Sequence, residues 1–365
     1  MTSESKTKVA MIRKILKENN ASGMYISRRD NFAWLTCGKQ NHVSNGTEFG
    51  FSGLLVTLSR VYLITDNIEM PRMLNEELIE FECEKIQFDW FENDRDKIIR
   101  KIIGTGDLFS DTHISNSIDC NKKIQPLKYS LCSDEIERYR ETCVLSALAV
   151  EDSCREIEIG MSEYQIAAKI SHKCIANGIN AEVTLVATDE RIFQYKHPIP
   201  TDKKLSKYAM LVVCGRKYGL VASVTRLVHI GAIPYDLEAR YGDLLGIEAQ
   251  FLLNTKPDNK VSEIFTHGIS AYKIFGYKDD WKEHHQGGAT GYAGREYIAT
   301  NGCYEKVKEN QAFAWNPTLR GVKVEDTILA TKNGIEVLSH TGKWAYEHVK
   351  ASNDDVYIRP KILSI

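Results

Sequence analysis

Residues 283–292 of the chain read Glu283-His284-His285-Gln286-Gly287-Gly288-Ala289-Thr290-Gly291-Tyr292, with two adjacent histidines followed by three glycines. Glycine lets a backbone approach a ligand closely, so an imidazole beside it can share the same space. A flexible turn that carries histidines is the alternative interpretation. We interpret the stretch as part of a site, and the sequence leaves open whether His284 or His285 faces it.

His197 lies in a second such segment, Tyr195-Lys196-His197-Pro198-Ile199-Pro200. The residue before a proline adopts extended or turn backbone, which would expose this imidazole at the end of a strand. Histidine is the usual acid or base near neutral pH. A solvated loop histidine is the alternative interpretation. The segment therefore makes His197 a candidate catalytic residue and does not decide between the two interpretations.

Two further segments bring an amide and a pair of carboxylates. Residues 313–317 read Phe-Ala-Trp-Asn-Pro, a strand that delivers Asn316 and then stops, although a packed edge and a turn have the same pattern. Residues 321–327 read Gly-Val-Lys-Val-Glu-Asp-Thr, which places Glu325 and Asp326 next to each other on a strand. One of them must face inward if the sheet has a buried side. A buried carboxylate needs a partner, so it is either structural or catalytic.

Composition excludes several classes of protein. A length of 365 residues favours two domains, and 43% hydrophobic with 26% charged residues is typical of a globular protein with a core. A net charge of −2 gives no basic footprint for nucleic acid. No apolar run approaches the ~20 residues of a membrane span. The N-terminus lacks the apolar core of a secretory signal, and nine cysteines without a Cys-x-x-Cys pair indicate reduced thiols. We expect a cytoplasmic protein without nucleic-acid or membrane partners.

The first part of the chain alternates between helical and strand patterns. Apolar spacing predicts helices around Val9–Leu16, Glu69–Leu78 and Asp94–Ile103, and strands at Met24–Ile26, Phe32–Leu35, Leu54–Val56 and Val61–Ile64. This alternation predicts an α/β domain over residues 1–130, followed by a polar linker within Asn121–Ser133.

The second part begins with helices and continues with short strands. A long helix is predicted over Ile136–Ile157, and Ser162 with Gln165 forms a capping-box pattern for the next helix, which ends at Asn177-Gly178. Strands are predicted at Val183–Val186, Met210–Cys214, Gly219–Val224, Gln311–Trp315 and Gly334–Leu338, interrupted by helices at Asp236–Leu253 and Val261–Phe275. This order predicts an α+β domain over residues 131–365.

The motifs follow an order that resembles a known superfamily. Along the chain they are Gly160-Met161-Ser162-Glu163, His197-Pro198, Thr225-Arg226, His285-x-Gly-Gly, Asn316-Pro317 and Val324-Glu325-Asp326-Thr327. This order resembles the pita-bread superfamily of methionine aminopeptidases, proline-specific aminopeptidases and dipeptidases, and creatinase. Residues 31–36 (Asn-Phe-Ala-Trp-Leu-Thr) resemble the creatinase-type N-terminal domain. The resemblance implies an α/β N-terminal creatinase-like domain and an α+β pita-bread catalytic domain.

In the metallopeptidases of this superfamily, two aspartates, one histidine and two glutamates hold two metal ions. By the resemblance, His285 matches the histidine and Glu325 the last glutamate. Asn316 stands at the other glutamate position and Ser223 at one aspartate position, and residues 210–226 contain no acid at all. Two divalent ions need bridging carboxylates. We therefore expect no dinuclear metal site and no cofactor, and a single loosely held metal is the weaker alternative.

Creatinase and ectoine hydrolase are similar proteins that hydrolyse C–N bonds without metal. The resemblance implies that His197 acts as general acid and base, while Glu325 orients the water or binds a cationic nitrogen. His285 is the third expected catalytic residue. By the same resemblance Arg28 or Arg29 of a neighbouring subunit reaches the substrate carboxylate. The expected substrate-binding residues are Tyr292, Arg295, Trp315 and Asn316.

The sequence therefore predicts a homodimeric, metal-independent hydrolase that cleaves a C–N bond in a small amidine, amide or cyclic amino-acid derivative. One alternative is a metal-dependent Xaa-Pro aminopeptidase or dipeptidase. Another is a non-catalytic protein that kept the pocket and binds a ligand. The identity of the substrate stays open.

Overall fold

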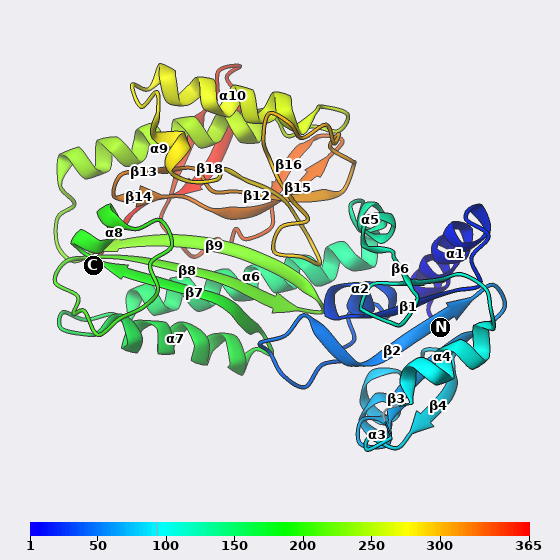
Figure 1. Ribbon diagram of the computed structural model, residues 1–365. Helices are drawn as coiled ribbons and strands as arrows, with labels where there is room; N and C mark the ends of the chain where they lie inside the picture. The colour runs from blue at the N-terminus through cyan, green and yellow to red at the C-terminus, as the bar shows by residue number, and fades with distance from the viewer. Residues whose placement is uncertain (93) are drawn as a thin grey trace. The chain divides into compact units, whose positions relative to one another are not determined.

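The computed structural model describes residues 1–92 and 94–365, which form two compact units (Figure 1). The first unit consists of Met1–Lys128, Cys132–Glu135 and Tyr218–Leu220, and the second of Tyr129–Leu131, Ile136–Lys217 and Val221–Ile365. Within the described ranges, no helix combines the length and apolar character needed to cross a bilayer.

The first unit is built on a six-stranded mixed sheet in the order β4-β3-β2-β1-β5-β6. Strands β1, β2 and β3 are antiparallel, and the outer pairings β1–β5, β5–β6 and β3–β4 are parallel. The strands are β1 (Gly23–Arg28), β2 (Phe49–Thr57), β3 (Val61–Asp66), β4 (Glu84–Phe88), β5 (Leu108–Ser110) and β6 (Ile118–Asp119). The helices are α1 (Ser3–Glu18), α2 (Arg29–Leu35), α3 (Met70–Arg72), the π-helical turn η1 (Met73–Glu77), α4 (Arg95–Ile103), α5 (Asn121–Ile124) and η2 (Gln125–Lys128).

One expected strand of this unit is a helix. Residues 32–35 were expected to be extended, but they form the end of α2, and all four side chains are buried. A short apolar run does not separate a strand from a fully buried helix. The turn from β1 into α2 is held by Asp111, whose carboxylate accepts hydrogen bonds from the backbone N–H groups of Ser27 and Arg28 and from the Asn31 amide. That contact comes from 80 residues away and leaves no local signal.

The second unit contains a four-stranded sheet (β19-β9-β8-β7), a five-stranded sheet (β11-β10-β12-β15-β16) and two strand pairs (β13-β14 and β17-β18). Its strands are β7 (Asn180–Thr188), β8 (Tyr208–Lys217), β9 (Leu220–His229), β10 (Gly287–Thr290), β11 (Tyr297–Ile298), β12 (Gln311–Trp315), β13 (Thr318–Leu319), β14 (Val322–Lys323), β15 (Asp326–Thr331), β16 (Gly334–Val337), β17 (Tyr346–Lys350), β18 (Val356–Pro360) and β19 (Leu363–Ser364). Its helices are α6 (Ser133–Arg155), α7 (Glu163–Ala176), α8 (Glu190–Gln194), α9 (Tyr235–Asn254), α10 (Val261–Ile274) and η3 (Asp280–Glu283).

Strand β8 shows why this unit is layered. Its residues Ala209, Leu211 and Val213 pack into one core cluster with α6 and α7, and the alternate residues Met210 and Val212 pack into another with α9 and β12. Figure 1 shows α6 and α7 on one side of strands β7–β9, and the second sheet with α9 and α10 on the other. Because successive side chains point to opposite faces, burial on both sides makes the strand a continuous apolar run.

The helix α7 begins where its local sequence predicts. The Ser162 side chain accepts from the Gln165 N–H, and the Gln165 side chain accepts in return from the Ser162 N–H. These two bonds satisfy donors that the first turn of a helix leaves free. The capping box predicted from the sequence is therefore confirmed, and the expected ends of β12 agree with the structure to the residue.

Candidate active site

The two adjacent histidines stand directly before β10, and the glycines after them have a packing role. Gly287 has φ +95°, and a Cβ there would lie 2.1 Å from the carbonyl oxygen of Ala314 on β12. Gly288 is held as closely on the other side, where a Cβ would lie 2.2 Å from the carbonyl oxygen of Tyr297 on β11. No side chain fits at either position. At these two glycines the backbone therefore lies close to the neighbouring strands, and not to a ligand as the sequence suggested. This packing fixes the position of the start of β10 and of the histidines before it.

Three imidazoles meet in this region. His197 comes from the segment after α8, and its Nε2 lies 3.0 Å from Nε2 of His284. The rings of His284 and His285 stack with centroids 4.4 Å apart, and the rings of His285 and His197 are 5.8 Å apart. Both adjacent histidines therefore face His197, which answers the question that the sequence left open. His197 is exposed and His284 is buried.

Glu325 is paired with two cations of its own chain. Lys323 Nζ lies 2.7 Å from Glu325 Oε2, and Arg295 Nη2 lies 2.7 Å from Glu325 Oε1. The Glu325 and Lys323 side chains are almost fully buried, and that of Arg295 is 18% exposed. Arg295 Nη1 also lies 3.4 Å from the hydroxyl oxygen of Ser223, whose other neighbour is Cys214, at 3.5 Å between Sγ and Oγ.

These charges determine the protonation of the site. Burial alone would raise the pKa of Glu325, but Lys323 and Arg295 outweigh it and lower that pKa to about 2, so the carboxylate is ionised. Burial and the charge of Lys323 lower the pKa of His284 to about 3, and burial and Arg295 lower that of His285 to about 4. Burial and Lys323 also lower the pKa of His197. At neutral pH the site therefore has three neutral imidazoles beside one anion and two cations.

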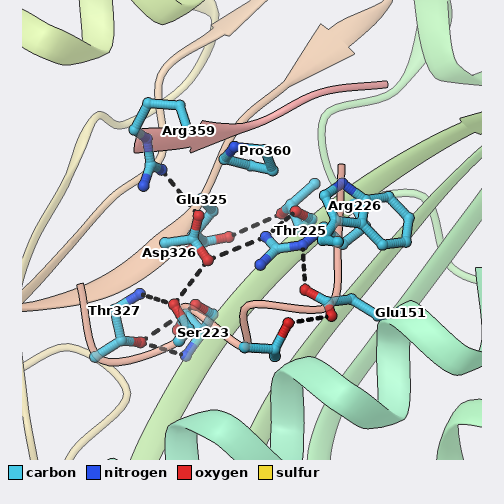
Figure 2. Close-up of polar contacts among 12 residues, drawn as sticks. Glu151, Ser223, Thr225, Arg226, Glu325, Asp326, Thr327, Arg359 and Pro360 are labelled. Carbon is cyan, nitrogen blue, oxygen red and sulfur yellow. Dashed lines mark hydrogen bonds and ion pairs between the residues drawn. The ribbon is translucent and has the colours of Figure 1, made fainter. Parts of the chain in front are cut away.

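Asp326, the neighbour of Glu325, belongs to a separate buried network (Figure 2). Its carboxylate accepts from Arg226 Nη1 at 3.0 Å and from Arg359 Nη2 at 2.9 Å. Arg226 also pairs with Glu151, and Arg359 pairs with Glu248; all five side chains are at most 1% exposed. The sequence predicted that at least one of the two adjacent carboxylates faces inward. Both are buried: Glu325 lies in the candidate site and Asp326 in this network.

Two hydrogen bonds beside this network hold Glu325 and the start of β15 against β9. The Thr225 N–H donates to the Glu325 carbonyl oxygen at 2.9 Å, and the Ser223 N–H donates to the Thr327 hydroxyl at 2.8 Å. These bonds join residues about 100 positions apart in the chain. They fix the position of the Glu325 backbone, and therefore the point from which its side chain extends.

Other expected site residues lie in different surroundings. Trp315 packs between Phe251 and Phe313 in the core, and its indole N–H donates to Thr255. Asn316 is buried directly after β12, and its Oδ1 has no hydrogen-bond partner among the residues that the structure describes.

The Tyr292 side chain is also fully buried. Arg28 and Arg29 belong to the first unit. Arg28 pairs with Asp30 and Glu48, and the guanidinium of Arg29 donates to the carbonyl oxygens of residues 45 and 47.

Lys323 is the site residue that sequence analysis missed, although its signal was present. In the run Val322-Lys323-Val324-Glu325, the two charged residues alternate with two valines that belong to the hydrophobic core. Alternation on an extended chain puts Lys323 and Glu325 on one face. A lysine and a glutamate two residues apart on a buried strand therefore already indicate an internal ion pair.

Comparison with known proteins gives this site a family. The model of "Metallopeptidase family M24" matches residues 137–332, which is more than half of the chain. The chain is 26% identical over 228 residues to the Xaa-Pro dipeptidase of Pyrococcus furiosus, and 25% identical over 228 residues to that of Pyrococcus horikoshii. Each match covers 60% of this chain, and it covers 65% and 64% of the two relatives, less than two thirds of their length.

A solved structure shows that the fold extends over both units of the chain. The prolidase from Pyrococcus horikoshii OT3 superposes with a TM-score of 0.78 at 19% identity, covering 92% of this chain and 98% of the prolidase. The expected fold, an α/β N-terminal domain followed by a pita-bread domain, is thereby confirmed. With the family match over the domain that holds His197, His285 and Glu325, the chain belongs to metallopeptidase family M24, a family of hydrolases that act on C–N bonds.

Proposed function

We propose that this chain hydrolyses a C–N bond of a small substrate at the site formed by His197, His285 and Glu325, and that it does so without a pair of metal ions. The observation that carries the proposal is the double ion pair of Glu325 with Lys323 and Arg295. The carboxylate that would serve as a metal ligand already has two cations within 2.7 Å.

The donor set argues against two divalent ions. Such a pair needs bridging carboxylates to offset four positive charges. The side chains around Glu325 are instead a thiol, two hydroxyls and two cations: Cys214, Ser223, Thr225, Lys323 and Arg295. Burial raises the pKa of the Cys214 thiol, which keeps it protonated and a poor ligand. These side chains therefore do not suit a dinuclear metal centre.

The residues present can perform the hydrolysis by proton transfer and electrostatics. Neutral His197 takes a proton from water as the water oxygen bonds to the substrate carbon, and the imidazolium then gives that proton to the leaving nitrogen as the C–N bond breaks. Lys323 and Arg295 supply positive charge close to the oxygen on which negative charge develops. Glu325 keeps both cations in place. His284, within hydrogen-bond distance of His197, can share the proton.

The relatives favour a dipeptide substrate and support a second candidate function. Both Pyrococcus relatives are named Xaa-Pro dipeptidases, and the family is one of metallopeptidases. Sequence similarity therefore supports the metal-dependent Xaa-Pro dipeptidase better than the metal-independent alternative, whereas the charges around Glu325 support the latter. Xaa-Pro dipeptides are the first substrates to test under both proposals.

Chelation separates the two candidates. After dialysis against EDTA, we expect the protein to hydrolyse Xaa-Pro dipeptides or related small amides at an unchanged rate, because its cations belong to the chain. The measurement is release of the free amine, with and without chelator and with added Mn²⁺ or Co²⁺. Activity that appears only with added metal, or two tightly bound ions per chain, would establish the metal-dependent dipeptidase. Substrate binding without turnover in every condition would establish the non-catalytic alternative.

A second test uses the pH profile of the chelated protein. Burial and then Lys323 lower the pKa of His197 from the ordinary value of 6.5, so the acidic limb of kcat/KM should lie below pH 6.5. Replacing Lys323 by methionine removes one cation and leaves Glu325 less screened. Both changes favour imidazolium, so the pKa of His197 should rise and the acidic limb should move to higher pH.

The matched control is Lys278→Met, which removes an exposed lysine and should leave the profile unchanged. The pKa of His197 can also be followed directly by NMR titration. A limb that stays in place or moves to lower pH in Lys323→Met would show that Lys323 does not act on His197.

The homodimer and the role of the arginines remain part of the proposal. Arg28 is held by Asp30 and Glu48, and its pKa is raised as these two charges outweigh its burial. Its side chain is still 23% exposed, so it can meet a carboxylate only by sharing its guanidinium with Asp30 and Glu48. The more buried Arg29 donates to two carbonyl oxygens and suits a structural role better.

A further inference from the structure

We propose that His197, His284 and His285 together form a binding site for a single transition-metal ion of the Zn²⁺ type. One nitrogen atom from each imidazole lies within 4.8 Å of a nitrogen atom of the other two. The site uses His284, which has no part in the ligand set that the resemblance implies. It is distinct from a dinuclear centre because it needs no carboxylate.

The distance between two of the three ligands fits one ion after a small adjustment, and the third ligand nitrogen lies within 4.8 Å of both. Zn–N bonds of 2.0–2.1 Å in a tetrahedral site separate two ligand nitrogens by about 3.3 Å. The Nε2 atoms of His197 and His284 are 3.0 Å apart, so they need to separate by only a few tenths of an ångström. A hydrogen bond between these two imidazoles also explains their distance, but it does not account for the His285 ring stacked on His284.

His285 needs one change to join the site. Its Nδ1 accepts the N–H of Gly287 at 3.2 Å, which is at the long end of the normal range. Binding a metal through Nε2 moves the proton of the neutral ring to Nδ1 and gives up this bond. Three histidines with solvent in the fourth position form a known ligand set for zinc, and the exposed side of His197 leaves that position open.

The surrounding charges determine which metals bind. Lys323 and Arg295 oppose a dication, and Glu325 offsets only part of their charge. Binding must therefore come from the metal–imidazole bonds, which favours Zn²⁺, Ni²⁺ and Cu²⁺ over Mn²⁺ and Mg²⁺. A carboxylate-rich dinuclear site would discriminate less against Mn²⁺ and Mg²⁺.

One other cluster among residues 1–92 and 94–365 has three potential ligands, and it serves as a contrast. Glu4, Cys132 and Glu135 also lie within reach of a single ion. The ammonium group of Lys8 already lies 2.6 Å from both carboxylates. A cation of the chain therefore already fills that cluster.

The consequence for activity rests on the proposed function. A metal ion takes the lone pair that His197 needs as a base, so the bound form should be inactive and chelation should restore turnover. The site itself does not depend on that activity. Binding and hydrolysis are therefore measured separately on the same full-length protein.

The test is calorimetric titration of the chelator-treated protein with Zn²⁺, and absorption spectroscopy with Co²⁺ as a coloured probe. We expect one ion per chain, the intense visible bands of four-coordinate Co²⁺, and no competition from Mn²⁺. His197→Ala and His284→Ala should each weaken binding by about tenfold or more. His267→Ala, which removes an exposed histidine on α10, should bind as the unaltered protein does.

Circular dichroism confirms that each variant folds, and His197→Ala alters an exposed side chain, so it keeps the test valid if His284→Ala does not fold. Two ions per chain with competition from Mn²⁺, or unchanged affinity in folded His197→Ala, would overturn the three-histidine site. Tight single-ion binding by a protein that hydrolyses nothing in either form would keep the site and reject the proposed function.

Discussion

Replacing His197 by alanine should lower kcat by about 10²–10⁴-fold, the usual contribution of a positioned acid and base. Without a metal ion to make hydroxide, a side chain must take the proton from water and must also protonate the leaving nitrogen. The imidazole of His197 is neutral, exposed and next to His284, so it can do both in turn. The measurement is kcat for the best substrate from the dipeptide panel, in the presence of chelator.

The same assay on His285→Ala and His267→Ala gives the comparison. The exposed His267 should be dispensable, and loss of His285 should have the smaller effect because its Nδ1 is bonded to the Gly287 N–H. If His197→Ala retains turnover while His285→Ala abolishes it, the proton transfer belongs to the segment before β10 and our choice of histidine is wrong.

Replacing Arg359 by methionine should destabilise the second unit by about 3–5 kcal/mol, the range found when one partner of a buried ion pair is removed. The guanidinium bonds to both Asp326 and Glu248, and these three side chains are each about 1% exposed. Methionine fills part of the volume but leaves two carboxylates with less compensation. The free energy of unfolding can be measured by urea denaturation followed through tryptophan fluorescence.

Arg320→Met is the matched control for this variant. Its side chain is exposed, so the change should stay within about 0.5 kcal/mol of the unaltered protein. A similarly small effect for Arg359→Met would mean that water or a rearranged partner solvates Asp326 and Glu248. The network would then not be the element that holds β15 in place.

Local patterns predicted the elements whose stability is local. The capping box of Ser162 and Gln165 and the run that forms β12 could both be identified because their determinants lie within a few residues. The run from Phe32 to Leu35 could not, because the turn that makes it helical depends on Asp111. Composition alone does not reveal such a distant partner.

The same limit applies to the candidate site. Motif order named His197, His285 and Glu325, and the structure places all three in the second unit. The order of the motifs could not show that His284 faces His197, which is 87 residues away in the sequence. That contact depends on how the segment after α8 folds. Lys323 is a different case, because its alternation with Val322 and Val324 is a local pattern that the sequence itself contains.

Because Glu325 is paired with Lys323 and Arg295, its negative charge is balanced by side chains of the same chain and does not depend on the supply of a metal ion. A carboxylate whose charge is compensated by a bound metal ion loses that compensation when the metal is scarce. Here the compensating charges are side chains, so every copy of the protein contains them. An aspartate introduced at position 223 would lie beside Arg295, so it would pair with a cation of the chain before it could hold a metal ion.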